Sequence, residues 1–186
     1  MSIKLHKALF LDRDGVVNVD HGYVYQNEKF EFIKGIFSTC KTFFDAGYKI
    51  IVVTNQSGIG RGYYTEAEFK VLTQWMKTQF SNHDIKIADV YFCPHHPKKA
   101  LPEYLKQCDC RKPAPGMLLQ GIKEHNIDPE QSIMVGDKLS DMQAAQKAGI
   151  ATRVLVRSGQ SFDESAKQHA DLVIDSIDDL TKRLPL

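Results

Sequence analysis

The chain has 186 residues, of which 42% are hydrophobic and 25% are charged, and its formal net charge is +1. This length suits one globular domain with a sizeable core, so we expect a single domain over residues 1–186. A nearly neutral chain without a basic block is a poor match for nucleic acid or an anionic membrane surface. The longest apolar run, residues 50–53, is too short to span a bilayer, and the first 15 residues lack the apolar centre of a signal peptide. We therefore expect a cytoplasmic protein.

Short apolar runs alternate with amphipathic stretches along the chain. Several of the runs are apolar at consecutive positions, as in strands buried on both faces. Thr65 and Glu68 form the pattern of a capping box at the start of one amphipathic stretch. The alternation predicts an α/β protein with a Rossmann-like, doubly wound parallel sheet and helices on both faces. We expect strands at 7–12, 48–55, 88–93, 132–137, 152–156 and 171–175, and helices at 36–46, 65–80, 116–126, 139–148 and 177–183.

Acidic residues follow two of the predicted strands. Asp12 and Asp14 close the first strand in a DxDG pattern, and Asp137 closes the fourth, with Asp141 one turn later. The carboxyl ends of parallel strands share one edge of a sheet, and oxygen ligands at that edge suit Mg²⁺. Such aspartates can also merely cap turns and helices, but the two patterns together favour a site. We expect Asp12, Asp14 and Asp137 to bind Mg²⁺.

Two further segments offer groups that could bind phosphate. Residues 54–62 follow the second strand with Thr54, amide side chains and three glycines, whose N–H and O–H groups can donate to phosphate oxygens. The segment lacks the Gly-Lys-Ser/Thr ending of a nucleotide-binding P-loop. Arg111 and Lys112 supply cations from a later loop.

These parts combine into a phosphoryl-transfer chemistry. Asp12 can attack phosphorus and form an aspartyl-phosphate, which divides one difficult displacement into two easier ones. Asp14 can protonate the leaving oxygen and then activate water as a general acid and base. Thr54 and Lys112 would stabilise the phosphoryl oxygens during transfer.

A second metal site is indicated by the cysteines of the loop that follows the third predicted strand. Cys93 and His95 form a C-x-H pair, and Cys108 and Cys110 form a C-x-C pair twelve residues further on. Three cysteines and one histidine are a typical ligand set for structural zinc in a reducing compartment. His96 could compete with His95 for the fourth position. We expect a closed zinc site that anchors a loop over residues 93–110 and presents the cations that follow it.

Four ordered segments resemble the motifs of the haloacid dehalogenase superfamily: FLDRDGVVN, VVTNQSG, RKP and VGDKLSDM. Val16 departs from the pattern, because many members have Thr at this position. Within the superfamily, the metal loop and the segment CDCRKPAPGM resemble the D-glycero-D-manno-heptose-1,7-bisphosphate 7-phosphatases. Their relatives, the histidinol-phosphate phosphatases, carry a shorter interval between the histidine and the C-x-C pair.

This resemblance implies a domain with no large cap and a Mg²⁺-dependent removal of the 7-phosphate, in the synthesis of ADP- or GDP-activated heptose for lipopolysaccharide or surface glycans. The family pattern favours His95 as the zinc ligand, and it assigns Arg111 to the second phosphate or the sugar hydroxyls. The substrate contacts that the resemblance implies are Arg13, Asp20, His21, Gly22, Tyr23, Asn55, Gln56, Ser57, Arg111 and Lys138.

Two other functions remain open from the sequence. The first is hydrolysis of histidinol phosphate by the same chemistry. The second is a non-catalytic, zinc-stabilised binding module, which would be expected to have lost some of the acidic and basic residues that this chain retains. The anomer that is preferred at C1 also stays open. We expect a monomer, because no long apolar stripe remains after the core positions are assigned.

Overall fold

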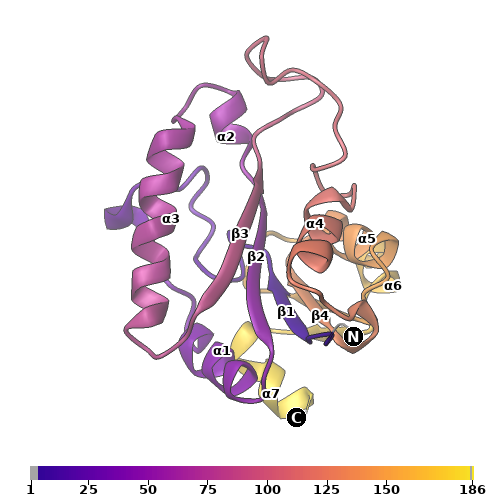
Figure 1. Ribbon diagram of the computed structural model, residues 1–186. Helices are drawn as coiled ribbons and strands as arrows, with labels where there is room; N and C mark the ends of the chain where they lie inside the picture. Colours follow the sequence, from indigo (N-terminus) through magenta and orange to yellow (C-terminus); the bar gives the residue numbers. More distant parts are fainter. Residues whose placement is uncertain (1–3, 185) are drawn as a thin grey trace.

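A six-stranded sheet forms the centre of the computed structural model, which describes residues 4–184 and 186 (Figure 1). The strand order is β3-β2-β1-β4-β5-β6, and every pair of neighbours is parallel. This topology confirms the predicted doubly wound parallel sheet. The strands are β1 (Ala8–Leu11), β2 (Lys49–Asn55), β3 (Ile87–Cys93), β4 (Ile133–Gly136), β5 (Thr152–Val156) and β6 (Leu172–Ile174).

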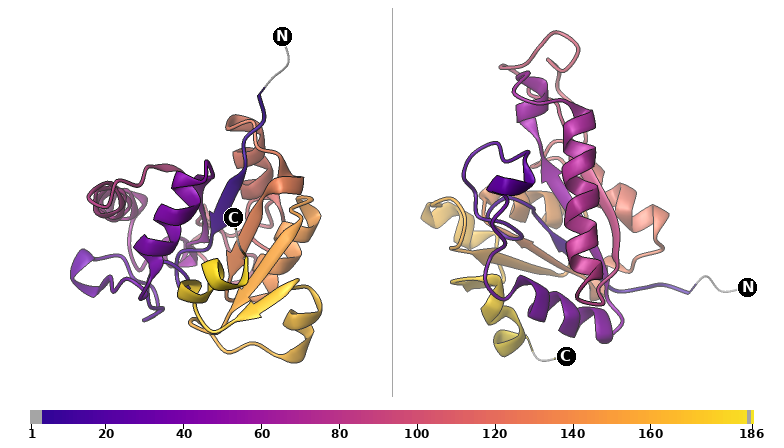
Figure 2. Two further views of the ribbon diagram at one scale, coloured as in Figure 1. Left: turned by 90° about the horizontal axis from the view of Figure 1, so that it is seen from below. Right: turned by 90° about the vertical axis from the view of Figure 1, so that its left-hand side faces the viewer.

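Helices cover both faces of this sheet, as Figure 2 shows from below. On one face lie α1 (Ile36–Asp45), α3 (Glu66–Ser81) and α7 (Leu180–Arg183), and on the other lie α4 (Gly116–Glu124), α5 (Leu139–Lys147) and α6 (Glu164–Gln168). The short helix α2 (Ser57–Gly60) follows β2, and single 3-10 turns occupy η1 (Asn27–Lys29), η2 (Pro129–Gln131) and η3 (Ile177–Asp179). None of the helices in the described part of the chain is both long enough and apolar enough to cross a membrane.

Every predicted strand and helix is present, with ends that differ by at most two residues, except that the last predicted helix divides into η3 and α7. The capping box is confirmed, since Thr65 Oγ1 accepts from the Glu68 N–H and the Glu68 carboxylate accepts from the Thr65 N–H. The sequence did not predict α2 and α6. They have four and five residues, which is too short to show a helical period.

Alternation along β1 divides the core between the two faces of the sheet. Leu9 and Leu11 pack with residues of α1 and α3, whereas Ala8 and Phe10 pack with residues of α4 and α5. Successive side chains of a strand point to opposite faces, so a strand covered on both sides needs an apolar residue at each position. This explains why the run is apolar without interruption.

The chain reverses its direction of winding between β1 and β4, which are neighbours in the sheet. From β1 the chain continues to β2 and β3 on one side, and it then crosses back to β4 on the other side. A crevice opens at such a reversal point, beyond the carboxyl ends of the two strands. Asp12 directly follows β1 and Asp137 directly follows β4, so both lie at this crevice.

The predicted metal loop rises above the carboxyl ends of the strands, beside α2 (Figures 1 and 2). The Leu101 N–H donates to the carbonyl oxygen of Gly60, the last residue of α2, at 2.6 Å. A side chain at Gly60 would meet the carbonyl oxygen of Pro94 at 2.3 Å from its Cβ. The glycine therefore allows the loop and the helix to approach each other closely.

Neighbouring positions on α3 test the assignment of the core. Leu72 is 3% exposed and packs in the core, whereas Val71 is 73% exposed. We expect Leu72→Ala to lower the free energy of unfolding by about 2–5 kcal/mol, because it removes apolar contacts and leaves a cavity. Val71→Ala should change it by less than about 0.5 kcal/mol. Urea unfolding measures both, and equal effects would contradict the position of α3.

Candidate active site

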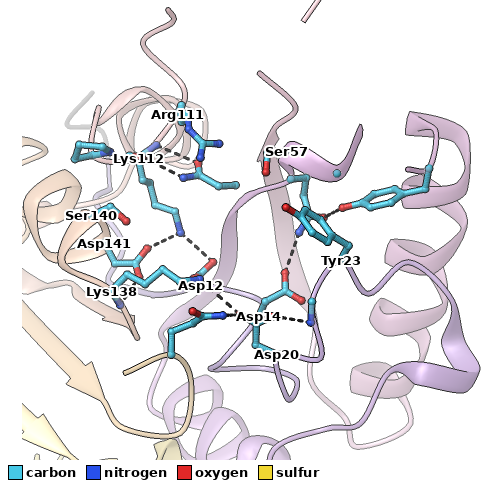
Figure 3. A pocket seen from close by; sticks show the side chains of 17 residues that line it. Asp12, Asp14, Asp20, Tyr23, Ser57, Arg111, Lys112, Lys138, Ser140 and Asp141 are labelled. Atoms are coloured by element: carbon cyan, nitrogen blue, oxygen red, sulfur yellow. Dashed lines mark hydrogen bonds and ion pairs between the residues drawn. The ribbon is translucent and has the colours of Figure 1, made fainter. Parts of the chain in front are cut away.

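A cavity of about 540 Å³ lies at the crevice between β1 and β4 (Figure 3). Its walls come from the segments that follow β1, β2, β4 and β5 and from the loop that precedes α4. Eleven of the residues expected at the site line it: Asp12, Asp14, Asp20, Gly22, Tyr23, Asn55, Gln56, Ser57, Arg111, Lys112 and Lys138.

Lys112 places a buried positive charge at this cavity. Its Nζ lies 2.9 Å from Asp12 Oδ1 and 2.6 Å from Asp141 Oδ1, and it donates to the carbonyl oxygen of Val53 at 2.8 Å. Burial by itself would lower the pKa of Lys112, but the two carboxylates outweigh it and raise the pKa. The ammonium group therefore stays charged, and Figure 3 shows it extended between the two aspartates.

Three carboxylates converge beside this lysine. One oxygen each from Asp12, Asp137 and Asp141 lies within 4.8 Å of the other two, and all three residues are buried. Burial, together with the charges of Asp12 and Asp141, raises the pKa of Asp137 to about 8. Among the described residues, Asp137 Oδ1 has no hydrogen-bond partner. A hard divalent cation would satisfy this oxygen and remove the repulsion, so the donor set fits Mg²⁺.

The carboxylate of Asp14 lies outside this cluster, which differs from the expectation that it binds Mg²⁺. Its oxygens accept from Arg13 at 2.9 and 3.1 Å, from Asn18 Nδ2 at 3.0 Å and from Gln56 Nε2 at 3.1 Å. Burial would raise the pKa of Asp14, but the Arg13 guanidinium and the other donors outweigh burial and lower the pKa. The residue is held as a carboxylate on the cavity wall, so it has to take up a proton before it can act as an acid.

The expected contact between Arg13 and the substrate is corrected by the structure. Arg13 is 2% exposed, and besides Asp14 its guanidinium donates to the carbonyl oxygen of Val24 at 2.7 Å. It also lies 5.8 Å from the ring centres of Phe30 and Phe69. Arg13 therefore lies behind Asp14 and is separated from the cavity, where it positions that carboxylate.

The segment after β1 contributes a second correction. Asp20, Gly22 and Tyr23 line the cavity as expected, but His21 lies outside its lining, with Nε2 at 3.1 Å from the Glu31 carboxylate. A positive φ of 77° at Gly22 and of 52° at Tyr23 turns the chain here. The turn directs Tyr23 into the cavity and leaves His21 half-exposed on the outside.

The residues after β2 have separate tasks. The Asn55 side chain exchanges two hydrogen bonds of 3.1 Å with the backbone of Lys112, which fixes the lysine loop to the sheet. Thr54 is buried just behind the cavity, and its Oγ1 accepts from Gln56 Nε2 at 2.8 Å. Ser57 begins α2 and faces the cavity in Figure 3.

Several cavity residues were not predicted from the sequence as site residues. Gln160 comes from the loop after β5, where its N–H donates to Asp137 Oδ2 at 2.8 Å and its side chain donates to Asp20 at 2.9 Å. A side chain at Gly159 would place its Cβ 2.1 Å from Asp137 Oδ2, so this loop packs tightly on that carboxylate. This loop contains no sequence motif that would have indicated its place at the site. Other lining residues of this kind are Gly58, Tyr64, Pro113, Ser140 and Asp141, the last of which the sequence placed one turn after Asp137 without a role at the site.

The loop above the cavity brings together the four residues predicted to bind zinc. Ligand atoms of Cys93, His95, Cys108 and Cys110 lie within 4.8 Å of one another, and the cysteines are unbridged. His95 Nδ1 lies 3.3 Å from Cys110 Sγ, whereas His96 Nδ1 accepts from the N–H groups of its own loop at 3.0 and 3.1 Å. The structure thus selects His95 over His96. Three thiolates and an imidazole at these separations fit a closed tetrahedral Zn²⁺ site.

Comparison with known proteins shows the family of the chain. It is 49% identical to a D-glycero-beta-D-manno-heptose-1,7-bisphosphate 7-phosphatase of Yersinia pestis, over 95% of this chain and 94% of that protein. It is 50% identical to the enzyme of the same name from Haemophilus ducreyi, over 94% of this chain and 96% of that protein. The chain belongs to this phosphatase family. Residues 109–180 also match the family model described as HAD-hydrolase-like.

Solved structures agree with this membership. The D,D-heptose 1,7-bisphosphate phosphatase of B. bronchiseptica, complexed with magnesium and phosphate, matches with a TM-score of 0.81 and 27% identity, over 95% of this chain and 97% of that one. A HAD-like phosphatase of Mesorhizobium loti matches with a TM-score of 0.77 and 33% identity, over 89% of this chain and 81% of that one. The parallel sheet and its helices are therefore those of the haloacid dehalogenase fold.

The corrected role of Arg13 can be tested by stability. We expect Arg13→Met to lower the free energy of unfolding by about 3–5 kcal/mol, because it leaves the buried Asp14 carboxylate without its cation. Arg157 pairs with Asp175 on the surface, where both side chains are exposed, so Arg157→Met should cost less than about 0.5 kcal/mol. Urea unfolding compares the two. If Arg13→Met is as stable as the wild type and only binds the substrate more weakly, the original expectation that Arg13 contacts the substrate would be correct.

Proposed function

We propose that this chain is a Mg²⁺-dependent phosphatase that removes the 7-phosphate of D-glycero-β-D-manno-heptose 1,7-bisphosphate. The observation that carries the proposal is the position of Asp12, which lies on the wall of the cavity, 2.9 Å from the Lys112 ammonium and within the acidic cluster that it forms with Asp137 and Asp141. A carboxylate held beside a fixed cation and a cation site suits nucleophilic attack on a phosphate. The names of the relatives support the sugar and its β anomer.

The magnesium site would use Asp12 and Asp137, whose Oδ1 is buried without a hydrogen-bond partner among the described residues. When bound, Mg²⁺ offsets the negative charge of the phosphoryl oxygens as they approach the carboxylates. The side chain of Asp14, which we expected to be the third ligand, pairs with Arg13 instead. The relative from B. bronchiseptica was solved with both magnesium and phosphate, which supports this choice of metal.

The reaction then follows from the protein's own groups. Asp12 attacks phosphorus, the bond between phosphorus and the C7 oxygen breaks, and Asp14 in its protonated form gives its proton to that oxygen. The Lys112 ammonium and the Thr54 hydroxyl stabilise the phosphoryl oxygens, because Thr54 Oγ1 accepts from Gln56 and keeps its own proton for another acceptor. Asp14 then takes a proton from a water molecule while that water attacks the phosphorus of the aspartyl-phosphate. This step releases phosphate and regenerates the Asp12 carboxylate.

Other lining residues would recognise the rest of the sugar. Arg111 and Lys138 line the cavity, as do Asp20, Gly22 and Tyr23, and Lys138 Nζ lies 3.7 Å from Asp20 and 3.8 Å from Asp137. Together with Lys112, these cations suit a substrate with a second phosphate group. Histidinol phosphate has only one phosphate and carries an amine, so it is the less favoured substrate. A non-catalytic module is disfavoured because Asp12, Asp14 and Lys112 keep their catalytic contacts.

The zinc site would have a structural task. Cys110 immediately precedes Arg111 and Lys112 in the chain, so a metal at the cysteine cluster would hold both cations at the cavity. The ligand set leaves no open position for chemistry. We further propose a cytoplasmic monomer that acts in activated-heptose synthesis, without nucleic-acid or membrane partners.

The assignment of nucleophile and substrate can be tested with purified protein and Mg²⁺. Phosphate release from the β anomer of the heptose bisphosphate should exceed that from histidinol phosphate by at least about tenfold in kcat/KM, because the second phosphate finds its own cations. Asp12→Asn should lower turnover by at least about 1,000-fold, since an amide cannot attack phosphorus. A fully active Asp12→Asn variant would refute the mechanism, and a preference for histidinol phosphate would refute the substrate.

Zinc binding can be tested by metal analysis of two cysteine variants. Cys108→Ser should lose the bound zinc and lower kcat, because the loop that carries Lys112 is released. Cys40 is a buried cysteine on α1 and is not part of the cysteine cluster, so Cys40→Ser should keep one zinc per chain. Zinc retained by Cys108→Ser, or absent from the wild type, would contradict the site.

A further inference from the structure

In the wall of the cavity, a chain of hydrogen bonds leads from Tyr64 to Asp14, the acid of the reaction. The Tyr64 hydroxyl donates to Gln56 Oε1, and Gln56 Nε2 donates to Asp14 Oδ2 at 3.1 Å and to Thr54 Oγ1 at 2.8 Å. Gln56 is 3% exposed and Tyr64 is 4% exposed. Neither group can exchange its partner freely with bulk water.

The direction of these bonds follows from the chemistry of the groups. A carboxylate accepts only, so Gln56 must present its amide nitrogen to Asp14. The amide oxygen then faces Tyr64, whose hydroxyl has to donate. The Tyr64 hydroxyl is thus the donor that satisfies the amide in the one orientation that lets Gln56 bind Asp14.

Packing holds Tyr64 rigidly in this position. Tyr25 stacks on its ring with centroids 5.0 Å apart and planes at 7°. On another side, a Cβ at Gly58 would lie 2.3 Å from the Tyr64 ring, so the glycine of α2 lets the ring approach. A hydroxyl on a ring with this little freedom is a fixed donor.

We propose that Tyr64 is a positioning residue for Asp14 and acts through the amide of Gln56. The proposal rests on the phosphatase mechanism above, though not on the identity of the sugar. Without the hydroxyl, Gln56 Oε1 is buried and unpaired, and the amide rotates or shifts to find a donor. Asp14 then loses a contact that aims its carboxyl group at the leaving oxygen.

The step affected is the first one. The bond between phosphorus and the leaving oxygen breaks as the bond from Asp12 to phosphorus forms, and the Asp14 proton moves to the leaving oxygen. A sugar alkoxide leaves poorly unless it is protonated, whereas 4-nitrophenolate leaves well without a proton. A misplaced Asp14 therefore slows the alkyl phosphate much more than the aryl phosphate.

The experiment compares Tyr64→Phe with the wild type on two substrates. These are 4-nitrophenyl phosphate and the sugar phosphate that the wild type hydrolyses fastest, so the test stands even if that sugar is not the heptose. We expect kcat/KM on the sugar phosphate to fall by about tenfold, and that on 4-nitrophenyl phosphate by less than about threefold. Equal falls on both substrates, or no fall on the sugar phosphate, would overturn the proposal.

Two controls separate positioning from damage to the fold. Tyr48→Phe makes the same chemical change at a tyrosine whose hydroxyl has no hydrogen bond to the described residues, so its two rates should match those of the wild type. In a Gln56→Ala background, Tyr64→Phe should have no further effect, because its intermediary is gone. Full additivity of the two substitutions would overturn the route through Gln56.

Discussion

The buried ammonium group of Lys112 is the interaction on which the site depends. It pairs with Asp12 and Asp141, which follow two different strands, and so it joins the two halves of the sheet at their point of divergence. Three carboxylates could not remain charged in this crevice without a cation nearby. The surrounding structure keeps the lysine in place: Asn55 clamps its backbone, Val53 accepts from its Nζ, and the cysteine cluster lies just before it in the chain.

Two aspartates that are two positions apart obtain opposite roles from their surroundings. Asp12 pairs with Lys112 and lies beside Asp137 and Asp141, whereas Asp14 is surrounded by the donors Arg13, Asn18 and Gln56. The first has a position suited to attack and to metal binding, and the second has one suited to proton transfer. Because the two carboxylates have different partners, a single site can supply both a nucleophile and an acid–base group.

The local pattern of the sequence was enough to predict the sheet, its longer helices and the acidic residues at the carboxyl ends of β1 and β4. Buried parallel strands need apolar residues at every position, and a reversal of winding brings the residues after β1 and β4 together. The spacing of the cysteines likewise predicted a metal loop, because a tetrahedral site needs two close pairs. The order of the motifs carried the resemblance to the haloacid dehalogenase superfamily, which the relatives confirm.

Tertiary structure alone decided which way individual side chains point and which distant segments meet them. Arg13 lies between the two predicted catalytic aspartates, yet it turns inward to the aromatic core, and His21 turns outward to Glu31. Gln160 reaches Asp137 from a loop with no motif, and Tyr64 contributes a hydroxyl from an otherwise apolar core position. Periodicity and spacing depend only on residues that are close together in the sequence. These contacts depend instead on backbone turns and on packing between residues far apart in sequence, so only the folded chain could determine them.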